Sequence, residues 1–421
     1  MSSKKRPRVC TYNGTATEPC PLPIPFDLRL DVLSRLDVAS LLRYSAASRS
    51  TRSDILSEDF CRSLALRAEA SRGFDPALLL GFSYRLPVRA STAGDRVAQT
   101  RRQHLLRFDA ILLDSFDPVA SRDGLVVLLR RPTDVEQRWA DALSGADLRV
   151  CNSLTGQASR LPPADVREAY PHALLAVGGA GRSFRLLAAD SDLRTQTFSS
   201  EDGRWGAVVE PRHAAHLPYI PPRYASRATV VGSTVYWLCI LKRDHVDGQP
   251  RPPNPPCIVS LDAGSSQASR IELPPGCLDR LRYHQTVLDA LMLAPSPDRR
   301  LSVLAAEICV ISMWTLSEGD NSSLPAARWT RQVVIWRHAI EHEPGPAYSV
   351  QFMGVGERSG TVVLQMYGIG LVQLNLGSRE AAVVRRDESF KRFFGYYNPG
   401  RFRLCLREIH LTALLQAMKP F

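Results

Sequence analysis

Residues 338–342 carry the pattern with the strongest claim to catalytic chemistry. His338, Glu341 and His342 match the HxxEH pattern of zinc proteases, in which one helix holds both imidazoles on the metal. A strand-like run at 332–336 ends directly before His338, and two prolines follow His342. A helix of useful length does not fit between them, so the sequence predicts a surface loop here.

The other candidate motifs are also better explained without catalysis. His213 and His216 lie in a proline-flanked segment with no partnering Cys or His nearby. Glycines cluster at 178–181 and 354–356, but no helical pattern follows that could receive a phosphate at its N-terminus, so both clusters predict hairpin turns. No GxSxG or P-loop motif occurs. We therefore expect no catalytic residue, no metal and no cofactor.

The positive charge is concentrated in two short segments. The net charge is +11, of which an N-terminal tail supplies +4 and residues 85–107 supply +5. The remainder lacks the broad positive field that gripping a phosphate backbone requires, so nucleic acid is not an expected partner. For the cation-rich and aromatic-rich segment 391–403 we likewise favour packing in a closing strand over ligand binding. The tail fits a short nuclear-import signal, with a solvated tail as the alternative; its cations are Lys4, Lys5, Arg6 and Arg8.

Length and composition are those of a soluble multidomain protein. The chain has 421 residues, 44% of them hydrophobic and 23% charged, which fits two or three domains. No apolar run approaches the roughly 18 residues of a membrane span, and no secretory signal follows the charged N-terminus. The nine cysteines are scattered singly, which predicts reduced, mostly buried thiols. We expect a location in the nucleus, the cytoplasm or both.

Apolar spacing from residue 24 predicts three short helices. Leu28, Val32 and Leu36 repeat at intervals of four, on one face of a helix whose opposite face is charged. Asp37 and Ser48 are suitable caps for a second and a third helix. So small a unit cannot bury all of its leucines, and the surplus predicts a docking surface for another protein.

From about residue 108 the pattern becomes β. Short runs of Val, Leu, Ile and aromatic residues alternate with turn residues and give roughly twenty strands. The segment 149–163 resembles 258–275, since each reads strand, polar turn, strand, Leu-Pro-Pro. A repeated strand pair indicates a propeller, and about four strands per blade give about five to seven blades. An amphipathic helix is expected over 404–418.

Residues 24–60 resemble the F-box. The match runs without gaps through an apolar-Pro opening, Asp27, Leu28, Val32-Leu33, Arg35-Leu36, Val38, Leu41-Leu42-Arg43, Ser48-Arg49, Arg52, Ile55 and the closing Phe60. Three residues depart from the pattern: Arg29 stands for a usual leucine, Asp37 for a proline and Thr51 for a tryptophan. The β-rich remainder, with its Val-Cys-Asn-Ser-Leu-Thr-Gly phrase before Leu-Pro-Pro, looks like the F-box-associated, propeller-like domains of plant F-box proteins.

This resemblance implies a multidomain α plus all-β protein with four parts. We expect a disordered basic tail at 1–20, a three-helix F-box at 21–66, a helix and Arg-rich connector at 67–107, and an F-box-associated β-propeller-like domain with a C-terminal helix at 108–421. In the family, the F-box binds a Skp-type adaptor and through it a cullin, while the C-terminal domain recruits the protein to be ubiquitinated.

The implied function is a non-catalytic substrate-recognition subunit of an SCF-type E3 ubiquitin ligase, acting on an unidentified protein substrate. The adaptor contacts carried over from the family are Ile24, Pro25, Leu28, Val32, Leu33, Leu36, Val38, Leu41 and Leu42. Packing between the helices is the alternative role, above all for Val32 and Leu36. Arg29 is the departure that could weaken adaptor binding. The alternative function is a propeller-type protein-interaction scaffold outside a ligase, and an enzymatic propeller is the third class.

Overall fold

The structure, a computed structural model, describes the helical segment and most of the β-rich part. The residues that it describes are 24–36, 38–60, 62–63, 74–85, 97–101, 112–113, 115–130, 147–153, 155–166, 171–178, 183–212, 219–220, 227–241, 256–281, 290–317, 328–340, 350–366, 369–385, 403–409 and 411. The expected basic tail, the start of the helix and connector expected at 67–107, and nearly all of the segment 391–403 lie outside these residues.

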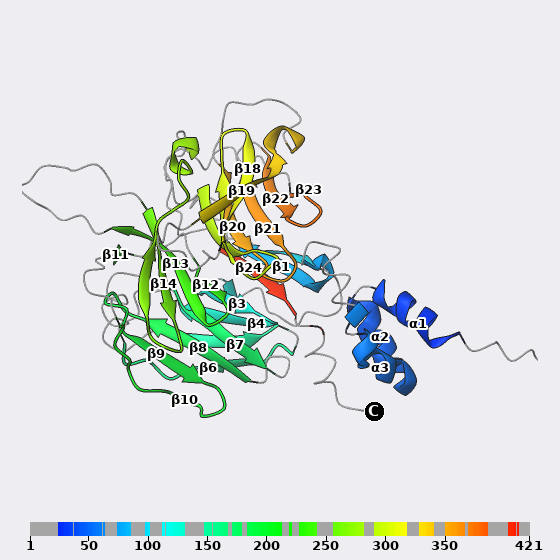
Figure 1. The fold of residues 1–421 in the computed structure, drawn as a ribbon. Helices are drawn as coiled ribbons and strands as arrows, with labels where there is room; N and C mark the ends of the chain where they lie inside the picture. The colour runs from blue at the N-terminus through cyan, green and yellow to red at the C-terminus, as the bar shows by residue number, and fades with distance from the viewer. Residues whose placement is uncertain are drawn as a thin grey trace, which may run out of the picture.

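Three helices precede the sheets in Figure 1: α1 Phe26–Ser34, α2 Val38–Ala47 and α3 Arg49–Ile55. α1 begins after Pro25, because the missing N–H of a proline costs nothing at a helix start. Asp27 in its first turn lies near the positive end of the helix dipole. Ser48 caps α3: its Oγ accepts a hydrogen bond from the Thr51 backbone N–H at 3.3 Å, which confirms the predicted cap.

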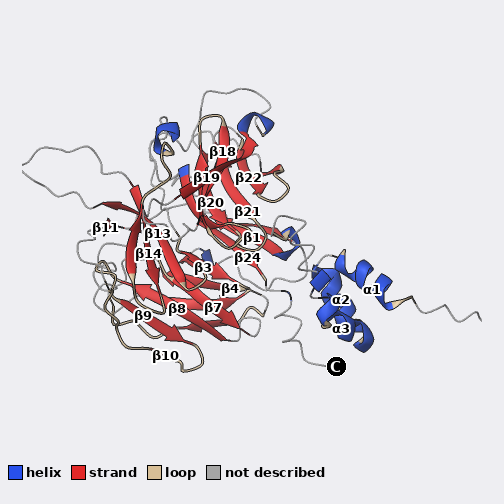
Figure 2. Cartoon of the chain, in the orientation of Figure 1, coloured by secondary structure: helices blue, strands red, loops and turns tan. Residues whose placement is uncertain are grey.

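The rest of the described chain is mainly β (Figure 2), and five antiparallel sheets of four or five strands form the blades of a propeller. The first two blades contain β3 Phe116–Arg122, β4 Leu125–Arg130, β5 Leu148–Asn152 and β6 Ala158–Arg160, then β7 Ala173–Gly178, β8 Ser183–Ala189, β9 Thr195–Ser199 and β10 Arg204–Trp205. The third contains β11 Tyr219–Ile220, β12 Thr229–Val231, β13 Thr234–Leu241, β14 Pro256–Asp262 and β15 Ala268–Ile271. The last two contain β16 Leu291–Pro295, β17 Leu301–Ala306, β18 Val310–Ser317 and β19 Arg328–Trp336, then β20 Val350–Val355, β21 Thr361–Met366, β22 Gly370–Asn375 and β23 Ala381–Arg385. The predicted propeller is confirmed.

A further, three-stranded sheet joins the two ends of the β-rich part. Its order is β2 (Val97–Arg101), β1 (Leu79–Arg85) and β24 (Arg403–Glu408). β1 and β24 pair in antiparallel register. β24 also lies against β3 and β20, the first strands of the first and last blades, so it closes the ring of sheets.

Two expectations are wrong in this closing sheet. Over residues 404–408 the expected helix is instead the strand β24, and these residues are buried throughout; nearly all of 410–418 lies outside the described residues. A short, continuously buried run cannot be assigned to helix or strand by its periodicity. The connector expected at 67–107 contains β1 and β2, so the β-rich part begins earlier than residue 108. The strand that pairs with β1 lies near the C-terminus, and no local pattern reveals that pairing.

The outer hairpins of four blades share one turn geometry. The side chain that begins each turn accepts a hydrogen bond from the backbone N–H three residues later; these side chains are Asn152, Ser199, Asp262 and Asn375. The residue four positions later has a positive φ in every case: Gly156, Gly203, Ser266 and Arg379. The predicted repeat of 149–163 in 258–275 is therefore confirmed as β5–β6 and β14–β15. The other two copies are less apparent in the sequence because different residue types occupy the same positions.

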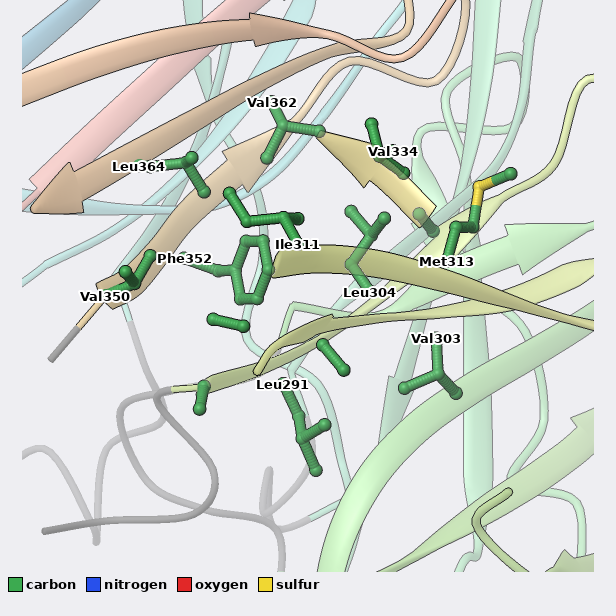
Figure 3. Close-up of a cluster of buried hydrophobic side chains, with 14 of the residues drawn as sticks. Leu291, Val303, Leu304, Ile311, Met313, Val334, Val350, Phe352, Val362 and Leu364 are labelled. Carbon is green, nitrogen blue, oxygen red and sulfur yellow. The ribbon is translucent and has the colours of Figure 1, made fainter. Parts of the chain in front are cut away.

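The largest cluster of buried apolar side chains joins the last two blades. In Figure 3, Leu304 and Ile311 of the β16–β19 blade lie near Phe352 and Leu364 of the β20–β23 blade. Burying one such side chain contributes about 1.5–3 kcal/mol. Each blade covers a face of its neighbour, so no blade is expected to be stable alone.

Gly360, in the turn between β20 and β21, provides a test of this packing. Its φ is +61°, and a Cβ added there would lie 2.4 Å from Cγ of the buried Phe74 ring. We expect Gly360→Ala to lower the free energy of unfolding by about 2–4 kcal/mol, from overpacking and backbone strain together. Gly203→Ala is the matched control, with φ +66° and open space around it, and should cost only about 1 kcal/mol. Equal losses in the two variants, measured by denaturant unfolding, would contradict the packing argument.

Candidate protein-interaction surface

Helix α1 has apolar residues on two opposite faces. Leu30 and Leu33 are buried, with 6% and 7% exposure. Ile24, Leu28 and Val32 are exposed by 60%, 57% and 56%. Leu28 and Val32 lie four residues apart on one face of α1, and the exposed Ile24 precedes the helix; we call these three residues the α1 stripe. An exposed apolar stripe of this kind is typical of a surface that another protein covers.

Apolar exposure is concentrated in this part of the molecule. Ten large hydrophobic side chains are exposed among the described residues, and six of them lie between residues 24 and 56. Besides the α1 stripe they are Phe26, Tyr44 and Leu56. The propeller spreads its other four over a much longer stretch of chain. The helices, rather than the described parts of the blades, therefore carry the better candidate for a protein interface.

The nine predicted adaptor contacts fall into different environments. Ile24, Pro25, Leu28 and Val32 are exposed, Leu36 and Leu42 are half-buried, and Leu33 and Leu41 are buried. The side chain of Val38 lies outside the described residues. The packing role considered for Val32 is wrong, because its side chain points to the surface. The structure leaves four of the predicted residues exposed and buries Leu33 and Leu41.

The buried leucines attach the helices to the closing sheet. Leu33 and Leu41 belong to one cluster with Phe60, Leu80 of β1 and Ile409, which follows β24. The Ile409 backbone N–H also donates to the Leu78 carbonyl oxygen at 3.1 Å. The helical unit therefore shares a core with the strands that close the propeller, and it is held by apolar packing.

Arg29, the departure from the F-box pattern, links two helices. Its guanidinium lies 3.3 Å from a carboxylate oxygen of Asp54 in α3 and 5.8 Å from the centre of the Phe26 ring. The Asp54 side chain is only 13% exposed. Arg29 thus has an intramolecular role between α1 and α3, and the α1 stripe remains apolar beside it.

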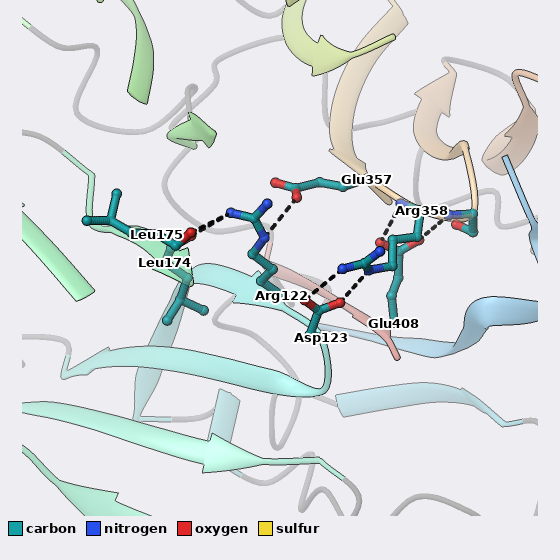
Figure 4. A network of polar contacts seen from close by, with 8 residues as sticks. Arg122, Asp123, Leu174, Leu175, Glu357, Arg358 and Glu408 are labelled. Carbon is teal, nitrogen blue, oxygen red and sulfur yellow. Dashed lines mark hydrogen bonds and ion pairs between the residues drawn. The ribbon is translucent and has the colours of Figure 1, made fainter. Parts of the chain in front are cut away.

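A network of charged side chains lies where the first and last blades meet (Figure 4). Arg358 pairs with Asp123, with Nη2 3.0 Å from Oδ2, and Arg122 lies 3.4 Å from Glu357. Glu408 accepts hydrogen bonds from the backbone N–H groups of Arg358 and Ser359. These residues come from the β3–β4 turn, the β20–β21 turn and the end of β24. Nothing in the local sequence indicates this network, because its members are separated by up to 286 positions.

Burial changes the acid–base behaviour of this network. The pKa of Glu357 is raised from 4.5 to about 7, mainly by burial, with Arg122 opposing the shift and Glu408 adding to it. Burial also raises the pKa of Glu408, against the hydrogen bonds that it accepts from residues 358 and 359. Both carboxyl groups therefore hold their protons more tightly in the folded chain than in the unfolded chain.

This shift predicts a pH dependence of stability. A raised folded-state pKa contributes stability below about pH 4.5, and that contribution is lost as the pH rises through about 7. Glu357→Gln should therefore flatten the dependence of the unfolding free energy on pH between about pH 5 and 8. Near pH 8, the variant should be about 1–3 kcal/mol more stable than the wild type. Glu272→Gln, which removes a 79% exposed carboxylate paired with Arg270, is the control and should leave the profile unchanged. A wild-type profile in Glu357→Gln would refute the prediction.

The catalytic alternatives receive no support from the described residues. No group of three or more His, Cys, Asp or Glu side chains lies close enough to hold a metal ion in the described part of the chain. β19 ends at Trp336, as expected, and a single 3-10 turn, Arg337–Ala339, carries the exposed His338. Glu341, His342, His213 and His216 lie outside the described residues. Gly178, at the end of β7, pairs with Ser183 of β8, and Gly354 and Gly356 lie at the β20–β21 hairpin, as predicted; residues 179–181 lie outside the described residues.

A cavity of about 710 Å³ lies beside the β16–β19 blade, between its first turn and strands β18 and β19. Its arginines are paired: Arg331 lies 2.5 Å from Glu307, and Arg300 pairs with Asp298. The rest of the lining is mainly hydroxyl and amide groups. The cavity therefore offers polar contacts without an unpaired charge.

Two further observations concern expected properties of the whole chain. Six cysteines are described, and all are free thiols; five are buried and Cys309 is exposed. No described helix has the length and apolar character needed to span a membrane. The proposed import residues Lys4, Lys5, Arg6 and Arg8 lie outside the described residues.

Comparison with protein families matches residues 81–421 to a family described as a domain of unknown function (DUF7595). No curated protein matches the chain. Among solved structures, the chain is similar to an oligogalacturonate lyase in complex with manganese, at 9% identity and a TM-score of 0.34, covering 71% of this chain and 91% of that one. It is also similar to the β-propeller domain of Myceliophteria thermophila Cps50 (Swd1), at 11% identity and a TM-score of 0.33, covering 65% and 88%. A Bacteroides thetaiotaomicron protein of unknown function matches at 10% identity and a TM-score of 0.33, covering 65% and 59%. These scores are too low to carry an argument about activity or ligands.

Proposed function

This chain belongs to the family described as a domain of unknown function (DUF7595), and from its own residues we propose that it is the substrate-recognition subunit of an SCF-type E3 ubiquitin ligase. In this proposal the helical segment binds a Skp-type adaptor, and through it a cullin. The propeller holds the protein to be modified. The observation that carries the proposal is the exposed α1 stripe, Ile24, Leu28 and Val32, within the segment that resembles the F-box.

Three features support adaptor binding by the helices. The α1 stripe is apolar and exposed, so covering it removes hydrocarbon surface from water. The segment is short, and its own core already contains Leu30, Leu33 and Leu41. The stripe therefore has no intramolecular partner among the described residues. A surface that is already folded loses less conformational entropy on association than a disordered segment does.

The shared core of helices and closing sheet suggests how the two halves cooperate. A ligase subunit of this kind contributes proximity: it raises the effective concentration of a substrate lysine beside the ubiquitin-charged enzyme. Proximity depends on a fixed distance between the two binding surfaces. The cluster that contains Leu41, Phe60, Leu80 and Ile409 would limit hinge motion between them. No catalytic residue of this chain is needed, and we propose a non-enzymatic role in the nucleus, the cytoplasm or both.

The test is direct binding of the purified full-length chain to a Skp-type adaptor by titration calorimetry. Saturable one-to-one binding, followed by recovery of a complex that also contains a cullin, is the expected result. Failure of a folded, monodisperse wild-type protein to bind would overturn the proposal. A thermal melt of the same sample establishes that it is folded.

The alternative is a propeller-type protein-interaction scaffold outside a ligase. Arg29 is the observation that favours it, because an arginine held by Asp54 stands where the F-box has a leucine. In that case the α1 stripe binds a different helical or apolar partner. Arg29→Leu distinguishes the two functions. In a ligase subunit whose adaptor binding is weakened by the arginine, the variant should bind the Skp-type adaptor more tightly than the wild type does. In a scaffold outside a ligase, the variant should still not bind the adaptor.

A further inference from the structure

The blade formed by β3–β6 carries three arginines around one carboxylate that is 11% exposed. Asp147 lies 3.0 Å from Arg160, 3.7 Å from Arg149 and 3.8 Å from Arg130, measured between the nearest nitrogen and oxygen atoms. We call these four residues the Asp147 cluster. The arginines come from the ends or middles of β4, β5 and β6, so three neighbouring strands of one rigid sheet position them.

The cluster has more positive charge than its carboxylate can neutralise. Three guanidinium groups share one acid, and no second carboxylate forms an ion pair with any of them among the described residues. Arg149 and Arg160 are also direct neighbours across the β5–β6 ladder. Like charges in directly opposed positions destabilise a sheet unless an anion lies between them. Among the described residues, the cluster therefore holds three positive charges against one negative charge.

The side chains are held in place yet remain accessible. The Arg149 guanidinium lies over the Phe116 ring at 4.5 Å from its centre, and that ring is buried. Nε of Arg149 is buried and has no hydrogen-bond partner. The side chains of Arg130 and Arg160 are exposed by 53% and 74%. An approaching anion can thus reach at least two guanidinium groups while the third is already oriented by its ring.

We propose that the Asp147 cluster is a binding site for a phosphate monoester. A monoester dianion carries two negative charges, equal to the excess of the three arginines over Asp147, and its three free oxygens match the paired N–H groups of arginine. Guanidinium is better suited than ammonium to this recognition because its planar fork donates two parallel hydrogen bonds. This site is independent of the adaptor surface and of the ligase function proposed above.

The experiment uses the full-length chain and three probes at low salt: phenyl phosphate, a short peptide with one phosphoserine, and dimethyl phosphate. We expect saturable binding of the two monoesters and at least about tenfold weaker binding of the singly charged diester. A peptide that binds more tightly than phenyl phosphate would identify a phosphorylated protein as the source of the ligand, whereas equal affinities would indicate a small phosphate ester. Absence of saturable monoester binding, or equal binding of the diester, overturns the proposal.

Variants locate the site and separate binding from folding. Arg149→Gln and Arg160→Gln should each weaken monoester binding about tenfold, while Asp147→Asn, which removes the competing carboxylate, should strengthen it. Arg270→Gln is the matched control, since Arg270 lies on the outer strand of another blade in a one-to-one pair with Glu272. Unchanged binding in both cluster variants, or an equal loss in Arg270→Gln, would show that phosphate binds elsewhere. Thermal melts of each variant exclude unfolding as the cause of a loss.

Discussion

Replacing Leu28 and Val32 together by aspartate is expected to weaken adaptor binding at least about a hundredfold, with little change in thermal stability. Both side chains are more than half exposed, so the folded chain loses few contacts when they change. In the complex, each new carboxylate would be buried against an apolar partner, at a cost of several kcal/mol. Since about 1.4 kcal/mol corresponds to a tenfold change in affinity, two such penalties exceed a hundredfold. Titration calorimetry of the double variant against the Skp-type adaptor measures the effect.

The choice of positions decides whether this experiment is informative. Leu33→Asp and Leu41→Asp would also abolish binding, but these residues are 7% and 0% exposed, so the helical unit itself would unfold. Ser378→Asp, in an exposed turn of the last blade, controls for an added negative charge elsewhere on the surface and should bind like the wild type. Wild-type affinity in the Leu28 and Val32 variant would exclude the α1 stripe as the adaptor surface.

The second large effect is expected at the point where the ring closes. Asp123→Asn should lower the free energy of unfolding by about 3–5 kcal/mol, because it leaves the Arg358 guanidinium largely buried without its carboxylate. Asparagine is chosen because the φ of Asp123 is +47°, and asparagine tolerates this conformation better than alanine does. Denaturant unfolding followed by tryptophan fluorescence reports the change.

Two controls test whether the buried pair is the cause. Asp298→Asn breaks an exposed pair with Arg300 and should cost less than about 1 kcal/mol. Arg358→Met combined with Asp123→Asn should recover part of the lost stability, because it removes the uncompensated charge. If the double variant loses more free energy of unfolding than the two single variants lose together, the pair does not stabilise the contact between the first and last blades.

Local chemistry made several features predictable from the sequence. The Ser48 cap follows from its own hydroxyl and a backbone N–H three residues away. The strands β5 and β14 and their polar turns follow from alternation and short-range hydrogen bonding. The propeller follows from repeating such a unit, because a sheet that buries its faces against copies of itself needs no other partner. Each of these arguments uses residues that are neighbours along the chain.

The features that resisted prediction depend on residues far apart in sequence. β24 pairs with β1, and Asp123 meets Arg358 across the closed ring, so neither could be recognised before the ring was assembled. The Asp147 cluster has a similar origin, since its arginines lie on three strands that only the sheet brings together. Its charges are evident in the composition, but their concentration at one carboxylate is not.

The apolar residues of the helices depend on both the sequence and the tertiary structure. By itself, the spacing of Leu28, Val32, Leu33 and Leu41 determined that this segment is helical and has more apolar surface than so small a unit can bury. Only the tertiary structure decided that Leu33 and Leu41 supply the core, while Leu28 and Val32 remain at the surface. The physical reason is that helical periodicity specifies which residues share a face. Which face is covered depends on the strands β1 and β24, and these meet the helices only after the whole ring has closed.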